Sequence, residues 1–353
     1  MTIRISQRFR IIVFLLAFTP TTARCPAQSA LSQVPGQGQQ SPTAIGFASP
    51  HYQADFSQVI ANGQHLVSWD KGHLVSYGAA EMKEPVTLYD KTGKLLFETS
   101  LTFENAIKVY GHDAAVTSSG TVVIAAAALT EDGKVADLIA EVGKDGIHRV
   151  VRTSPFRVLK LCETEQGIVW TYGEELTEDR SSERHGRYPM LREYSLDKGG
   201  LRSELDRITF IPPKGVPLAG AHGEFQMRCG AGKVVIVSGL TNELMEYDLA
   251  SSKLTRWPIA PLPEAFYLNG AAITDSGEIY VSTFRPGQNA QTGMLHLQVN
   301  SAGTVDWIPL TLGPASGKFF ILLGSDGEDL VYSRGRNAPT LFWSKTSQTE
   351  VTK

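Results

Sequence analysis

Cysteine is scarce in this chain, and an excess of basic residues and recognised catalytic motifs are both missing. The 353 residues include three cysteines, in neither a Cys-x-x-Cys pair nor a Cys/His spacing that holds a metal. The formal net charge is −3, which argues against nucleic acid and anionic membranes as partners, because both attract basic surfaces. Phosphate-binding-loop, dinucleotide-binding, GxSxG and His-Glu-x-x-His patterns are also missing. These absences leave the arrangement of the chain as the main source of information.

The N-terminus has the layout of a secretory signal peptide. Arg4, Arg8 and Arg10 precede an apolar run at residues 11–18, and small residues suited to cleavage follow. Eight apolar residues are too few for a bilayer core, which needs about 20, so a membrane anchor is the weaker alternative. We therefore predict a signal peptide over residues 1–27, a periplasmic or extracellular protein, and no transmembrane segment in the mature chain.

Residues 28–50 are rich in Gln, Ser, Pro and Gly and predict a flexible linker. A lipoprotein would use Cys25 as its lipidated residue, but Arg24 stands where a small residue is needed. Removal of the signal peptide takes away four arginines and no acidic residue, which changes the net charge from −3 to −7. The exported chain is thus expected to have an acidic surface.

Short hydrophobic β-runs recur through the rest of the chain, each directly after a glycine. The spacings between successive glycines are 48, 47, 65, 45 and 50 residues. These glycines are Gly72, Gly120, Gly167, Gly232, Gly277 and Gly327. A repeat of this size built from strands predicts an all-β, six-bladed β-propeller of four-stranded blades over residues 51–353. Residues 51–60 are expected to add a strand to the last blade, because closing the ring removes exposed strand edges.

One spacing is longer than the others because of a charged insertion at residues 173–187. In a propeller, the loops between second and third strands and between blades share one face, and we expect this elaborated face to bind a ligand or partner. A solvated insertion without a ligand is the alternative. The candidate binding residues, in or beside loops on that face, are Glu104, Arg157, His222, Glu224, Asn269, Arg285 and Arg334.

Cys162 and Cys229 occupy similar positions near the ends of the first strands of adjacent blades. In an oxidising compartment they can pair as a disulfide. The alternative is two small buried residues, because inner strands of neighbouring blades diverge and a disulfide tolerates only a narrow range of Cα separations. Both interpretations are open at this stage.

Residues 268–282 resemble the blade signature of NHL-repeat propellers and of the related gluconolactonase-type (TolB-like) propellers. The resemblance implies a six-bladed ring whose channel mouth receives a ligand, and in the lactonases a divalent metal held by an Asn, an Asp and a Glu. Asn269 matches the Asn, whereas Ser282 and Thr283 stand where the Asp is expected. Residues 64–69 contain no Glu at the matching position, and a lone Asn is a poor site for a hard cation.

Together these features predict an exported, monomeric β-propeller that acts as a binding module for a protein, peptide or glycan. We expect no cofactor and assign no catalytic residue. The alternative function is a metal- or cofactor-dependent hydrolase or lyase that acts in the channel. Three or more acidic or amide side chains converging on the channel axis would favour that alternative.

Overall fold

The computed structural model describes residues 45–47, 50–56, 65–78, 85–165, 167–176, 190–205, 225–239, 242–260, 267–285, 291–311, 320–334 and 340–348. The chain divides into two units, Met1–Ser41 and Pro42–Lys353, and every described residue belongs to the second. The predicted signal peptide and most of the predicted linker therefore lie outside the described residues.

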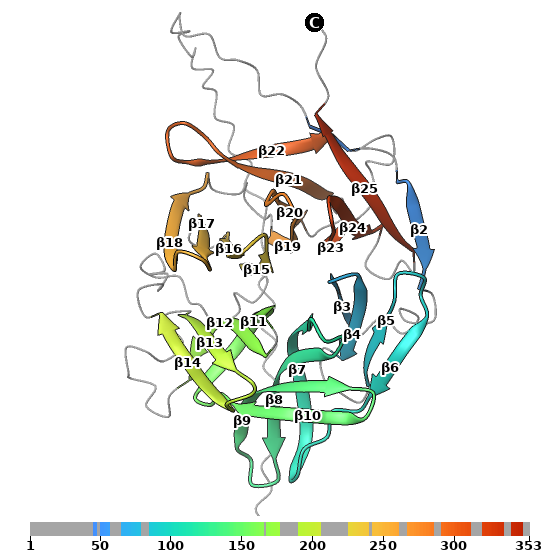
Figure 1. Cartoon of the computed structure of the whole chain (residues 1–353), viewed down its shortest axis with the longest axis vertical. Coiled ribbons are helices and arrows are strands. Elements are labelled where there is room, and N and C mark those ends of the chain that lie inside the picture. The colour runs from blue at the N-terminus through green and yellow to red at the C-terminus, as the bar shows by residue number, and fades with distance from the viewer. Residues whose placement is uncertain are drawn as a thin grey trace, which may run out of the picture. The chain divides into compact units, whose positions relative to one another are not determined.

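Antiparallel four-stranded blades follow one another in chain order and form the six predicted blades (Figure 1). Blades 1 to 4 are separate sheets, and β1 (Ile45–Phe47) joins blades 5 and 6 into one nine-stranded sheet. Blade 1 consists of β3 (His65–Asp70), β4 (His73–Gly78), β5 (Val86–Tyr89) and β6 (Leu95–Thr99). Blade 2 consists of β7 (Ala106–Val116), β8 (Val122–Thr130), β9 (Val135–Gly143) and β10 (Gly146–Arg152). Blade 3 consists of β11 (Phe156–Glu165), β12 (Ile168–Glu175), β13 (Met190–Ser195) and β14 (Gly200–Leu205).

The second half of the ring repeats this plan. Blade 4 consists of β15 (Phe225–Gly230), β16 (Lys233–Ser238), β17 (Glu243–Asp248) and β18 (Lys253–Pro258). Blade 5 consists of β19 (Tyr267–Ile273), β20 (Ile279–Arg285), β21 (Gln291–Val299) and β22 (Val305–Thr311). Blade 6 consists of β23 (Ile321–Asp326), β24 (Asp329–Ser333), β25 (Thr340–Gln348) and, from the other end of the domain, β2 (Tyr52–Asp55). The described residues contain no helix, and so no apolar helix long enough to span a membrane.

The six repeating glycines all lie in the turn between the first and second strands of a blade. Their φ angles run from 64° to 87°, the left-handed region that side chains with a Cβ rarely adopt. We call the face that carries these turns, and the turns between third and fourth strands, the turn face. The connections between second and third strands and between blades lie on the opposite face, the loop face.

Ring closure uses the N-terminal strands. β2 pairs antiparallel with β25, with Tyr52 opposite Trp343, which confirms that residues near His51 complete the last blade. At the C-terminus, β25 is one long strand whose outer partner among the described residues is β2. β1 (Ile45–Phe47) pairs with both β22 and β25, so pairing begins inside the segment that composition assigned to the linker.

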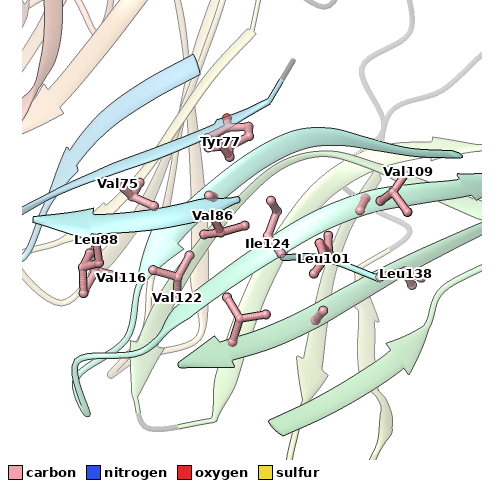
Figure 2. Close-up of a cluster of buried hydrophobic side chains, with 14 of the residues drawn as sticks. Val75, Tyr77, Val86, Leu88, Leu101, Val109, Val116, Val122, Ile124 and Leu138 are labelled. Carbon is pink, nitrogen blue, oxygen red and sulfur yellow. The ribbon is translucent and has the colours of Figure 1, made fainter. Parts of the chain in front are cut away.

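The core consists of apolar layers between neighbouring blades. Figure 2 shows the layer between blades 1 and 2, where Val75 and Val86 face Val122 and Ile124. These side chains are fully buried, and β-branched residues suit such packed strands. At the closing seam between blades 6 and 1, the buried rings of Trp69 and Trp343 meet edge to face at 5.0 Å. The hydrophobic β-runs seen in the sequence thus serve packing between blades.

Candidate functional site: the channel mouth on the turn face

The innermost strand of each blade leaves one edge without a strand partner, and buried backbone groups on such an edge need other hydrogen-bond partners. Side chains from neighbouring blades supply several of them. On the loop-face side of the channel, Asn269 Nδ2 of blade 5 donates to Phe320 O at 3.3 Å. Asp113 Oδ2 of blade 2 accepts from Leu161 N of blade 3 at 2.9 Å. These contacts hold the inner strands of neighbouring blades together.

Blades 1, 2 and 3 are joined at the turn face by a network centred on Glu163. The Glu163 side chain is fully buried, and its Oε2 accepts from Lys71 Nζ at 2.6 Å and from Ser118 N at 2.7 Å. Lys71 Nζ also donates to Val116 O at 2.8 Å. Asp70 Oδ2 accepts from Val116 N at 2.9 Å. One ion pair and its backbone partners therefore span three blades.

Blades 4, 5 and 6 are joined by a cation instead. Arg228 on β15 donates from Nε to Ala271 O of blade 5 at 2.8 Å and from Nη2 to Leu323 O of blade 6 at 3.1 Å. Ser325 of blade 6 donates back to Ile273 O of blade 5 at 2.6 Å. A guanidinium presents several donors in a rigid plane, which suits it to bridge carbonyl groups of two strands.

The seam between blades 3 and 4 carries a disulfide, so the structure has the paired alternative for the two cysteines. Cys162 on β11 and Cys229 on β15 are bonded, with their Cα atoms 5.6 Å apart. Cys162 is buried and Cys229 is partly exposed. The inner strands of these two blades therefore approach each other closely enough for a covalent link at the turn-face end.

A cavity of about 500 Å³ opens at the turn face where these networks meet. Its wall comes from the inner-strand turns of blades 1, 3, 4, 5 and 6. Its polar lining includes Asp70, Lys71, Glu163, Lys233, Asp275 and Asp326. Three of the repeating glycines, Gly72, Gly232 and Gly327, also line it and bring backbone atoms to the surface. We call this cavity the channel mouth.

Most charged groups of the mouth already have partners. Lys71 is paired with Glu163, Lys233 with Glu246 at 2.8 Å, and Asp326 with Lys91 at 2.5 Å. Burial raises the pKa of Asp70 above its ordinary value, and the nearby Lys71 ammonium opposes this only in part. Asp275 is exposed. Both lysines of the lining are already paired with carboxylates, and the positive charge of Arg228 also acts on Asp70 and favours its ionised form. The charge left over in the mouth is therefore negative and resides mainly on Asp275.

The structure does not gather the predicted binding residues into one site. Glu104 is exposed in the connection before β7, and Arg157 Nε lies 3.4 Å from Asp137 Oδ1. The Arg334 guanidinium covers the Phe342 ring at 4.4 Å. Asn269 donates to Phe320 O of the next blade, as described above. Within the described part of the chain, no hydrogen bond or ion pair joins any two of these four residues.

The remaining predicted residues lie outside what the structure describes. His222 and Glu224 belong to residues 206–224, which the structure does not describe. Most of the charged insertion at residues 173–187 is also outside the described residues. Arg285 ends β20, but its side chain is not described. The predicted use of the loop face is therefore untested by the fold and stays a prediction.

Asn269 is hydrogen-bonded to Ser282, and the pair joins two blades. Ser282, which stands where the lactonase resemblance expects Asp, donates from its hydroxyl to Asn269 Oδ1 at 2.5 Å. Ser282 Oγ also accepts from Leu322 N at 3.1 Å, so the pair links blades 5 and 6. Among the described residues, no group of three or more His, Cys, Asp or Glu side chains is arranged to hold a metal ion.

The residues that line the mouth can be located in the sequence by their distance from the repeating glycines, and loop length does not indicate them. Lys71 and Asp326 directly precede repeating glycines, and Asp275 stands two positions before another. Because the same turn recurs in every blade, charged residues next to these glycines must converge around one end of the channel. Alignment of the repeats on these glycines therefore predicts which charged residues line the mouth.

No protein-family model matches this chain, and no curated protein matches it. Among solved structures, a protein of unknown function from Bacteroides caccae aligns with a TM-score of 0.43 and 12% identity, covering 69% of this chain and 80% of that one. Hydrazine synthase from Kuenenia stuttgartiensis aligns with a TM-score of 0.41 and 12% identity, covering 90% of this chain and 100% of that one. The fold described above rests on the strand pairing of this chain alone.

Proposed function

We propose that this chain is an exported β-propeller binding module whose ligand site is the channel mouth on the turn face. The observation that carries the proposal is the 500 Å³ cavity, because residues from five blades converge there. A concave site of this size with a few converging polar groups is the common form of a ligand site. The N-terminal signal pattern and the disulfide support export, since disulfides persist in oxidising compartments.

The charge of the mouth favours a ligand with a positively charged amine. Asp275 faces the cavity without a cationic side chain bonded to it, and Asp70 accepts from a backbone amide and feels the charges of Lys71 and Arg228, whereas Lys71 and Lys233 are already paired. A cation entering the mouth would be attracted to both carboxylates, and an anion would be repelled. We propose a peptide that presents a lysine side chain as the simplest ligand of this chemistry.

A second surface on the loop face follows from the sequence and not from the cavity. The charged insertion and the residues Glu104, Arg157, Asn269 and Arg334 define where a protein or glycan partner would dock there. Substitution of Glu104, which is exposed, tests this surface without disturbing an interblade contact.

Calorimetric titration of the exported chain with lysine-containing peptides tests the proposed mouth. We expect measurable binding that is lost when the lysine is acetylated, and about 5- to 30-fold weaker binding for an Asp70→Asn, Asp275→Asn variant. Asp132→Asn is the matched control, because Asp132 is an exposed turn residue on the loop face. Equal affinity for lysine and acetyl-lysine peptides, or no binding of either, would contradict the proposal.

A further inference from the structure

We propose that the Cys162–Cys229 disulfide is a redox-sensitive clasp that sets the width of the channel mouth. Both cysteines directly precede residues of the mouth wall: Glu163 and Thr164 follow Cys162, and residues 230–233 follow Cys229. The S–S bond therefore ties together two neighbouring stretches of the wall, one from blade 3 and one from blade 4. The change in the width of the mouth is inferred from this placement of the two cysteines. Only its effect on ligand binding rests on the proposed function.

The cavity gives a reductant access to one sulfur in particular. Cys229 lines the mouth and is partly exposed, whereas Cys162 is 6% exposed and packs in an apolar cluster with Trp170 and Met227. Thiol–disulfide exchange requires a thiolate to reach a disulfide sulfur. The geometry thus directs attack to Cys229, and Cys162 is the leaving group.

The exchange consumes one dithiol for each disulfide opened. A thiolate of the dithiol attacks the Cys229 sulfur, the Cys162–Cys229 bond breaks, and the Cys162 thiolate takes up a proton. The second thiolate of the same reductant then attacks the mixed disulfide and releases Cys229, which is protonated in turn. The dithiol becomes a cyclic disulfide, and the chain gains two electrons and two protons.

The seam between blades 3 and 4 has apolar contacts that reduction leaves in place. The Tyr172 and Phe225 rings lie 5.3 Å apart, and the Trp170 and Tyr247 rings lie 4.9 Å apart. These side chains belong to one buried cluster that extends away from the mouth. Loss of the disulfide should therefore loosen the turn-face ends of β11 and β15 while the ring stays closed.

Glu163 links this clasp to the rest of the mouth. It follows Cys162 directly and also accepts hydrogen bonds from Lys71 and Ser118. Movement of the β11 end thus changes the position of the carboxylate that pairs with Lys71. In the oxidised protein the mouth is held in one shape, and in the reduced protein its blade 3 and blade 4 walls separate.

Hydrogen exchange of the whole exported chain, oxidised and after reduction with dithiothreitol under native conditions, tests the clasp. We expect amide protection in residues 159–165 and 226–233 to fall about tenfold or more, with β8 and β20 unchanged. We also expect the midpoint of thermal unfolding to fall by about 4–10 °C. A Cys162→Ala, Cys229→Ala variant serves as the control and should show no response to dithiothreitol.

Two results would overturn the inference: unchanged protection after the thiols are shown to be free, or a disulfide that dithiothreitol opens only once the protein is unfolded. If the double variant does not fold, the reduced natural chain still decides the question by the same measurement. Titration of both redox states with the lysine peptide separates the two proposals. Absent binding in the oxidised state refutes the proposed function alone, and binding equal in both states refutes the control of the mouth.

Discussion

The two halves of the ring meet the same physical requirement with opposite charges. In blades 1–3 a buried carboxylate, Glu163, accepts hydrogen bonds from Lys71 and from backbone amides. In blades 4–6 a cation, Arg228, donates to backbone carbonyls of the next two blades. Glu163 satisfies turn amides of blades 2 and 3, and Arg228 satisfies carbonyls on inner-strand edges that have no strand partner. These positions therefore need side chains that form hydrogen bonds with the backbone, and a negative or a positive side chain can serve.

The halves are joined to each other in different ways at their two boundaries. The disulfide links blades 3 and 4, whereas the N-terminal strand β2 and buried aromatic rings close the ring between blades 6 and 1. At the closing seam, Gly324 allows a close approach, because a Cβ there would lie 2.1 Å from Trp69 O. One boundary can thus be opened by chemistry and the other only by unfolding.

Trp343→Ala should have the largest effect, because it breaks the closing seam. Trp343 is fully buried, meets Trp69 and Tyr52, and donates from Nε1 to Asp326 at 3.1 Å. Removal of such a side chain costs about 3–5 kcal/mol. Denaturant unfolding measures the loss. Trp257→Ala, at a partly buried ring on the outer strand of blade 4, is the control, and an equal loss for both would contradict the special role of the seam.

Lys71→Met should destabilise the protein more than Arg228→Met, which compares the two halves directly. The first leaves the buried Glu163 carboxylate without its cation, at about 3 kcal/mol, whereas the second leaves neutral carbonyls without donors, at about 1–3 kcal/mol. The free energies of unfolding of both variants provide the test.

Adding Glu163→Gln to Lys71→Met sharpens this comparison. The double variant should regain part of the lost stability, because a neutral amide replaces the unpaired charge. The same Glu163→Gln change added to Arg228→Met should give no such gain. A ranking in which Arg228→Met costs more, without rescue of Lys71→Met, would show that charge is not what distinguishes the halves.

Asp70→Asn should have the smallest effect, visible mainly in the pH dependence of stability. Burial raises the pKa of Asp70 in the folded protein above its ordinary value of 3.8. The folded state therefore binds more protons than the unfolded state just above pH 3.8, and stability from this group falls as pH rises through the folded pKa. The Asn variant should lack this fall, so its stability relative to the natural chain should increase with pH in that window. Parallel pH profiles for the two proteins would rule the effect out.

The number and order of the blades could be predicted from the sequence because a turn is a local requirement. Gly232, for example, has φ 71° between two strands, and any residue with a Cβ would be strained there. The hydrophobic β-runs that follow these turns also depend on residues close together in the chain. The third and fourth strands of blades 1 to 5 pair across short turns for the same reason, as β5–β6 shows at residues 86–99.

The sequence predicted that an N-terminal strand closes the ring, but it did not predict that a second strand further upstream also joins the sheet. The pairing of β2 with β25 agrees with the expectation for residues near His51, whereas β1 lies in a segment whose composition indicated a linker. Composition fails there because β1 gains its backbone partners from strands about 260 to 300 residues away in the chain. A short segment with little to bury can still add to a sheet whose edge is already formed.

The sequence by itself determined the repeat, the strand order and the positions of the turns, because these depend on backbone angles and on contacts between neighbours in the chain. Only the tertiary structure decided which side chains meet at the channel mouth. Lys71 and Glu163 lie 92 residues apart in the chain, and Arg228 reaches a carbonyl 95 residues further on. Such pairs form because the curvature of the ring brings one end of every inner strand to the same axis, and that curvature is a property of six packed blades together.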